Sequence, residues 1–393
     1  MRRMRATFLR DFLLRAGAVA IALGAGLLVA EIAVRAWNPV EIHQVRGLNA
    51  SFAQHDELLG WRLEPNASAR FVREDFDVLV SNNSHGFRDR EYAVEKPRTT
   101  RRIVILGDSM TWGLGVENDS CYSEVLERAL AAAPATSAGA PVEVLNFGAA
   151  GYGTDQEYLL LRDTAIRFAP DVVVIAYNAN DVLNNSASAQ HGYHKPFFKP
   201  AGGAIALAGV PVPPRDGWDT PWKMTPVGRF LMKRSALYAF VRVRLDFLFI
   251  RFGEESLFAK AGGYKLELSG RDAEITTRAL FDSLYATSRA NGAEPLLLIT
   301  VPPRFMKKTD PFQASLLAHA RSRSVRVLDL APSFEAALDE GPLFWPNEGH
   351  WTPLGHRVAG GELARFIDEQ QLLASAPAHA HSPGDSVAPT GAE

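Results

Sequence analysis

The chain has 393 residues, of which 47% are hydrophobic and 22% charged, so it can bury a large core and is not generally disordered. Its 42 lysines and arginines nearly balance its 44 aspartates and glutamates, and the formal net charge of -2 excludes the broad basic surface typical of nucleic-acid binding. The single cysteine, Cys121, excludes an intrachain disulfide and is expected to be a small buried side chain.

Residues 1–36 have the layout of an export signal or a signal anchor. Arginines between Arg2 and Arg15 precede an apolar stretch from Ala16 to Ala30, which continues past Glu31 to Ala36 and is long enough to cross a membrane. We expect an anchor rather than a cleaved signal, in the bacterial inner membrane, with the arginines in the cytoplasm and the rest of the chain on the periplasmic side. A plain buried core helix is the alternative interpretation.

Residues 37–101 are polar and mixed, and they are expected to form a linker and an irregular or β-rich lead-in to the main domain. The segment from Asp77 to Val80 is typical of a strand, and the residues from Ser81 to Gly86 are typical of a turn.

Residues 102–372 alternate between short apolar runs and amphipathic stretches. The apolar runs predict strands at 103–106, 142–145, 172–177, 296–301 and 325–328, and the amphipathic stretches predict helices at about 122–133, 155–168 and 272–290 and from Pro353 onward. Thr154 and Glu157 are expected to form a capping box at the start of the second helix. This order predicts a three-layer α/β/α fold with a doubly wound parallel sheet.

An insertion at about 184–270 interrupts that alternation. Residues 184–225 are rich in glycine, proline and aromatic residues and are expected to form a long loop or lid over the site. The segment from Gly228 to Phe252 is apolar with interspersed arginines, which fits either a basic amphipathic helix on the membrane or a helix packed on the core. Residues 373–393 are of low complexity and are expected to be disordered.

Gly107, Asp108 and Ser109 directly follow the first predicted buried strand. In an open parallel sheet ligands bind at the carboxyl ends of the strands, so a serine at this point faces the crevice. A serine hydroxyl that attacks a carbonyl needs a base to accept its proton and donors to hold the oxyanion that forms. Ser109 is therefore the candidate nucleophile.

Candidate donors follow the next two strands. Gly148 and Gly151 offer backbone N–H groups that no side chain obstructs, and the segment from Asn178 to Asp181 includes amide side chains. The base is expected far along the chain, because the sheet must close before it can approach. His350 lies just before the last helix, with Glu348 two residues earlier as a carboxylate that can orient the imidazole. His356 lies inside that helix and is expected to be structural.

These four blocks resemble the SGNH, or GDSL, hydrolase family in their order and spacing from about Arg102 to Ile367. The resemblance extends upstream to the segment from Asn83 to Asp89, which is similar to membrane-anchored members. It implies an acyl-enzyme mechanism with Ser109 as nucleophile and His350 as base. The oxyanion hole would be formed by Ser109 N–H, Gly151 N–H and the Asn180 side chain, with Asp108, Asn178 and Asp181 in supporting roles.

The chain departs from the family pattern at two places. Asn178 stands where the asparagine block usually begins with glycine, and Glu348 and Asn347 stand where the family has its aspartate. Glu348 is the expected acid of the triad, because a longer carboxylate can reach with some backbone adjustment; otherwise catalysis would rest on a dyad.

The resulting hypothesis is a serine esterase acting on acylated carbohydrate or lipid. An O-acetyltransferase of cell-surface polysaccharide is one alternative, because anchored proteins of the alginate-acetylation kind have a similar acid-x-His-Trp pattern. A catalytically silent glycan-binding module is the other. No cofactor is implied, and the ten histidines show no ligand-spaced cluster that would indicate a metal. No pattern indicates an oligomeric state.

Overall fold

The computed structural model describes residues 2–37, 52–73, 75–133, 139–190, 193–214, 227, 230–231, 235–238, 241, 265–268, 270–301, 311–346 and 349–374. Its helical elements are α1 (Arg2–Trp37), α2 (Ser109–Trp112), η1 (Asn118–Ser120), α3 (Tyr122–Ala132), α4 (Thr154–Asp163), η2 (Ala165–Phe168), α5 (Asp181–Asn185), α10 (Gly270–Ala290), α11 (Pro311–Ser322), α12 (Ala331–Ala336), η4 (Leu338–Glu340) and α13 (Pro353–Glu369).

The strands fall into a lead-in group, a central group and an inserted group. They are β1 (Ala53–Asp56), β2 (Gly60–Leu63), β3 (Ser68–Val72), β4 (Asp77–Ser81), β5 (Arg101–Gly107), β6 (Val142–Gly148), β7 (Val172–Tyr177), β8 (Ala187–Gln190), β9 (Tyr193–His194), β10 (Phe197–Ala201), β11 (Ala204–Ala208), β12 (Lys265–Leu266), β13 (Glu294–Ile299) and β14 (Arg326–Asp329).

The central sheet has five parallel strands in the order β14-β13-β7-β5-β6. The chain enters at β5, moves to the β6 edge, and then returns past β5 to build the other half from β7. The direction of winding therefore reverses between β5 and β7, and a crevice for ligands is expected at the carboxyl ends of the strands at such a point.

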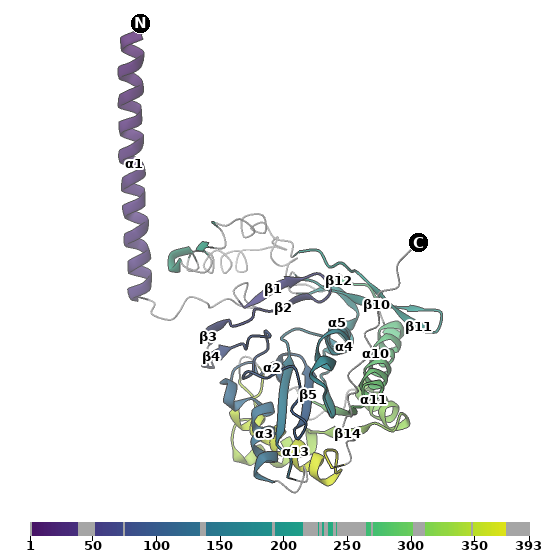
Figure 1. Cartoon of the computed structure of the whole chain (residues 1–393). Helices are drawn as coiled ribbons and strands as arrows, with labels where there is room; N and C mark the ends of the chain where they lie inside the picture. The colour runs from purple at the N-terminus through teal and green to yellow at the C-terminus, as the bar shows by residue number, and fades with distance from the viewer. Residues whose placement is uncertain are drawn as a thin grey trace.

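The central strands are buried on both faces. In β5, Val104 and Leu106 belong to the core shared with α4, α10 and α11, whereas Ile103 and Ile105 belong to the core shared with α3, α12 and α13. Figure 1 shows α10 and α11 on one side of the sheet and α3 and α13 on the other. The expectation of a three-layer, doubly wound α/β/α fold is therefore confirmed.

The start of α4 differs from the expected capping box. The cap residue is Gly153 rather than Thr154, and Gln156 Oε1 accepts a hydrogen bond from the Gly153 N–H at 3.4 Å. The helix also ends at Asp163, and a separate short helix, η2, follows it. Glu157 is consequently free of any capping role and is turned into the interior, where it is 1% exposed.

The first part of the insertion is not the long loop that its composition predicted. β10 and β11 form an antiparallel hairpin, and β8 pairs with both β9 and β12. Phe197, Phe198 and Val212 are buried. The insertion therefore adds side chains of its own to the interior, and Phe198 belongs to the core shared with α4 and α10. Most of the segment from Gly228 to Phe252 and the tail from residue 375 lie outside the described residues, and the domain boundaries at 36, 101 and 372 stay predictions.

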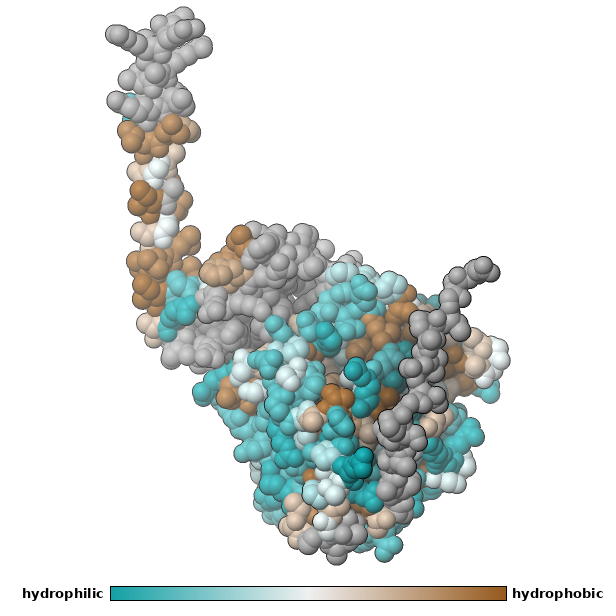
Figure 2. Space-filling view, in the orientation of Figure 1, coloured by the Kyte–Doolittle hydropathy of each residue, from teal (hydrophilic) through white to brown (hydrophobic). Residues whose placement is uncertain are grey.

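The N-terminal helix α1 projects from the rest of the molecule (Figure 1). An 18-residue stretch within its segment Asp11–Ala36 has a mean hydropathy of 2.2, and α1 is the one described helix that is long and apolar enough to cross a membrane. Hydrophobic residues cover much of its described surface (Figure 2). Glu31, near its C-terminal end, accepts hydrogen bonds from the backbone N–H groups of Ala236 and Leu237 at 2.8 and 2.9 Å.

We expect the Leu280→Ala variant to lower the free energy of unfolding by about 2–5 kcal/mol, because it opens a cavity between α10 and the sheet. Leu280 is 0% exposed. Ile275→Ala on the same helix is the control, since Ile275 is 41% exposed, and its effect should be small. Urea unfolding of the full-length protein in detergent, followed by near-ultraviolet circular dichroism, measures both. Equal losses in the two variants would contradict the assignment of α10 to the core.

Candidate active site

The serine block forms a tight turn between β5 and α2. Asp108 caps α2, because its Oδ1 accepts a hydrogen bond from the Met110 N–H at 2.9 Å. A Cβ atom at Gly107 would lie 2.1 Å from Thr111 Oγ1, so the strand can pass this closely under the helix only with glycine at that position. The turn places Ser109 at the first position of a helix, above the carboxyl end of β5.

The structure brings His350 to Ser109. His350 Nε2 lies 2.9 Å from Ser109 Oγ, although the two residues are 241 positions apart in the chain. The loop that carries His350 is held by the Trp345 N–H, which donates to the His350 carbonyl at 2.8 Å, and by the Trp351 indole, which donates to the Val301 carbonyl at 2.9 Å. The pair has the distance that proton transfer from a serine to a histidine requires.

The asparagine block meets the serine block through one carboxylate. Asp108 Oδ2 accepts hydrogen bonds from Asn178 Nδ2 at 2.9 Å and from Asn180 Nδ2 at 3.2 Å. Asp181 in turn accepts from the Asn178 N–H at 3.1 Å. The Asn180 amide has two hydrogens and uses one of them on Asp108, so the second can serve a ligand.

The glycine block forms a β-turn beside the serine helix. The Tyr152 N–H donates to the Ala149 carbonyl at 3.1 Å, and the Ala149 N–H donates to the Gly107 carbonyl at 3.0 Å. Gly151 is the third residue of this turn and has φ +82°, a conformation that favours glycine. Within the described residues, neither the Ser109 N–H nor the Gly151 N–H donates to a protein acceptor, so both can bind an incoming oxygen.

The upstream Asn83–Asp89 segment holds the loop after α2 and the end of β6. Arg88 is 2% exposed and donates to the carbonyls of Trp112, Gly113 and Val116. Asp89 Oδ2 accepts from the Asn146 N–H at 2.7 Å, at the end of β6. The segment therefore joins the lead-in to both the serine block and the glycine block.

Sequence reasoning missed a cluster of buried acids beneath the site. Burial raises the pKa of Glu157 well above its usual range, and the neighbouring Asp181 and Asp108 carboxylates raise it further. Neither oxygen of Glu157 has a hydrogen-bond partner among the described residues, and burial without partners strongly disfavours the ionised form. The pKa of Asp181 is raised for the same reasons, first burial and then Asp108. The available sequence signal was a pair of acids, Asp155 and Glu157, directly after the glycine block, where α4 begins.

Two other expectations concern residues near the site. Cys121 is buried, and burial raises the pKa of its thiol. Burial lowers the pKa of His356 to about 3, and its Nδ1 accepts a hydrogen bond from the Tyr122 N–H at 3.1 Å, so this histidine is a neutral structural residue.

Glu348 and Asn347, the candidates for the acid of the triad, lie outside the described residues. The described part of the chain contains no group of three or more histidine, cysteine, aspartate or glutamate side chains arranged to hold a metal ion.

Comparison with known proteins assigns the segment that carries this site to a family. The model of the GDSL-like lipase/acylhydrolase family matches residues 105–358. No curated protein sequence matches the chain.

Solved structures that match the chain include TesA, which is 15% identical over 70% of this chain and 100% of that one, with a TM-score of 0.38. The acetyl xylan esterase AlAXEase is 12% identical over 68% of this chain and 99% of that one, with a TM-score of 0.38. A member of the lipolytic protein G-D-S-L family from Veillonella parvula is 12% identical over 67% of this chain and 97% of that one, with a TM-score of 0.36. Because the family model covers more than half of the sequence, including Ser109, Gly151, Asn180 and His350, the chain belongs to the GDSL-like lipase/acylhydrolase family.

Proposed function

We propose that the protein is a membrane-anchored serine esterase that removes O-acyl groups from cell-surface carbohydrate or lipid. The observation that carries the proposal is the 2.9 Å contact between His350 Nε2 and Ser109 Oγ at the carboxyl ends of the central strands. A base at hydrogen-bond distance is what a serine hydroxyl needs to become a nucleophile at neutral pH.

In the first half of the reaction, Ser109 Oγ attacks the ester carbonyl while its proton passes to His350 Nε2. The carbonyl π electrons move to the oxygen, and the resulting oxyanion accepts hydrogen bonds from the Ser109 N–H, the Gly151 N–H and the Asn180 amide. When the intermediate collapses, the bond to the leaving alcohol breaks, and His350 returns the proton to the alcohol oxygen. The product is an acyl-enzyme on Ser109 and a free alcohol.

In the second half, water attacks the acyl carbonyl and gives a proton to His350. Collapse of the second intermediate breaks the bond to Ser109 Oγ, which regains that proton, and a carboxylic acid leaves. A sugar hydroxyl in place of water would give acyl transfer instead. We favour water; pure protein incubated with a p-nitrophenyl ester, with and without oligosaccharide, separates the two outcomes, because acylated sugar without excess hydrolysis would indicate a transferase.

The serine and histidine variants test the nucleophile and the base. We expect Ser109→Ala and His350→Ala to abolish both fluorophosphonate labelling and ester hydrolysis, because the first removes the attacking oxygen and the second removes the proton acceptor.

Ser120→Ala and His319→Ala are matched controls, since Ser120 contacts the neighbouring Asp119 and His319 contacts Asp282 on α10. Labelling that persists in Ser109→Ala would overturn the assignment of the nucleophile. A wild-type protein that never labels would indicate a silent binding module.

Glu348 is proposed as the acid that orients His350. We expect Glu348→Gln to lower kcat by roughly tenfold to ten-thousandfold, because the neutral amide no longer stabilises the imidazolium. Glu340→Gln is the control, since Glu340 is exposed and, within the described part of the chain, forms an ion pair with the surface residue Arg357 at 3.5 Å. A wild-type rate in Glu348→Gln would mean that catalysis rests on the Ser109–His350 dyad.

We also propose that α1 crosses the inner membrane once and leaves the catalytic domain in the periplasm. The support is its apolar length together with the arginines at its N-terminal end. An alkaline phosphatase fusion after Glu393 should be active, and replacing the arginines from Arg2 to Arg15 with glutamate should lower that activity. The mass of the purified chain should include residues 1–36; a shortened chain would indicate a cleaved signal.

A further inference from the structure

Two side chains from the region that begins the insertion hold consecutive carbonyls of the glycine turn. Gln190 Nε2 donates to the Gly151 carbonyl, and Asn184 Nδ2 donates to the Tyr152 carbonyl at 3.1 Å. Both side chains belong to buried residues, with Gln190 and Asn184 each 1% exposed. The two carbonyls that follow the Gly151 N–H along the chain are therefore held by side chains that lie outside the central sheet.

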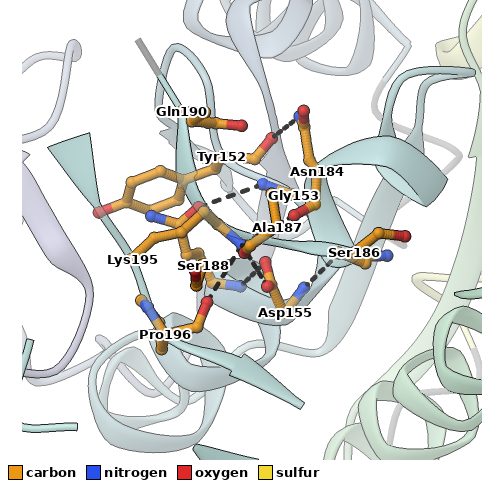
Figure 3. Close-up of polar contacts among 12 residues, drawn as sticks. Tyr152, Gly153, Asp155, Asn184, Ser186, Ala187, Ser188, Gln190, Lys195 and Pro196 are labelled. Atoms are coloured by element: carbon orange, nitrogen blue, oxygen red, sulfur yellow. Dashed lines mark hydrogen bonds and ion pairs between the residues drawn. The ribbon is translucent and has the colours of Figure 1, made fainter. Parts of the chain in front are cut away.

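A buried ion pair fixes this region to the start of α4. Lys195 and Asp155 have fully buried side chains, and Lys195 Nζ contacts the Asp155 carboxylate. The same ammonium donates to the carbonyls of Asn184 at 3.0 Å and Pro196 at 3.1 Å (Figure 3). Removing one partner of such a pair leaves a buried charge without compensation, so the pair strongly favours one arrangement of the segment.

The glycine turn is anchored at its two ends, because the Ala149 N–H and the Tyr152 hydroxyl donate to carbonyls of neighbouring segments. Between these ends, Gly151 has wide conformational freedom, and among the described residues one backbone hydrogen bond, from the Tyr152 N–H to the Ala149 carbonyl, closes the turn. A donor that stabilises an oxyanion must point at the position where the charge develops, and displacements of about 1 Å can cost about a hundredfold in rate. The contacts of Gln190 and Asn184 restrict the turn that presents this donor.

We propose that Gln190 is a positioning residue for the Gly151 N–H, and that the Lys195–Asp155 ion pair keeps the inserted strand β8 in place to serve it. The inference rests on the proposed function, in which the Gly151 N–H binds the oxyanion. Gln190 acts through the Gly151 peptide and touches no substrate. The insertion therefore contributes to the rate of the chemical step through the glycine turn.

The first test compares Gln190→Ala with Ser188→Ala in the full-length protein, using p-nitrophenyl acetate as the substrate. We expect Gln190→Ala to lower kcat about 10- to 100-fold with little change in KM, because ground-state binding does not depend on the oxyanion donor. Ser188 lies on the same strand, but its hydroxyl donates to Glu267 at 2.8 Å within the insertion. Ser188→Ala should leave both constants unchanged.

The second test uses Gln190→Glu, which keeps the shape of the side chain and donates a hydrogen bond only when the carboxyl group is protonated. Burial raises the pKa of a carboxyl group, so protonation increases as the pH falls from about 8 to about 6. As the pH falls over that range, the kcat of Gln190→Glu divided by the kcat of the wild type should rise. The same kcat ratio for Gln190→Ala should not change with pH. If Gln190 were only structural, the kcat ratio would not change with pH in either variant. That result would overturn the positioning role.

Hydrogen–deuterium exchange of the peptide containing residues 149–153 gives a readout that does not require catalysis. Exchange should be faster in Gln190→Ala than in the wild type and unchanged in Ser188→Ala. An active wild type with an unchanged kcat in Gln190→Ala would overturn this inference alone. A wild type that neither labels with fluorophosphonate nor hydrolyses the ester would overturn the proposed function, and with it the catalytic meaning of Gln190.

Discussion

The carboxylate of Asp108 is the connection on which the rest of the candidate site depends. One of its oxygens caps the helix that begins at Ser109, and the other accepts hydrogen bonds from Asn178 and Asn180. The serine follows β5 and the asparagines follow β7, so these bonds span the point of the sheet at which the winding reverses. The strand order that builds the core thus also brings nucleophile and amide donors to one rim.

Segments outside the central sheet stabilise the short elements at this rim. A helix of four residues and a glycine turn have little stability of their own, because they make few internal hydrogen bonds. Arg88 from the lead-in secures the loop after α2, and Lys195 from the insertion secures the region that contacts the turn. Both use buried charges, whose loss leaves partners unpaired in a low dielectric. The lead-in and the insertion are therefore parts of the site's framework.

The five central strands and the helices α3, α4, α10 and α13 were predictable because each is a local pattern, either a short apolar run or an amphipathic stretch. Helix α11, between β13 and β14, was not predicted. Predictions of local structure were wrong where the same residue pattern is compatible with two structures. Thr154 and Glu157 have the spacing of a capping box, but Gly153 caps the helix and Glu157 is buried. The composition of residues 184–225 predicted a loop, yet hairpins form there because aromatic side chains such as Phe198 find space in the core.

The sequence by itself determined the order of strands and helices and singled out Ser109 and His350 as candidates, since both stand directly beside recognisable elements. It contained no sign that Gln190 would reach the glycine turn or that Lys195 would pair with Asp155. Such contacts join residues that are 40 and 39 positions apart, through side chains whose direction depends on how the insertion packs. Only the tertiary structure decided them, because hydrogen bonding and desolvation act between neighbours in space, and sequence patterns record neighbours along the chain.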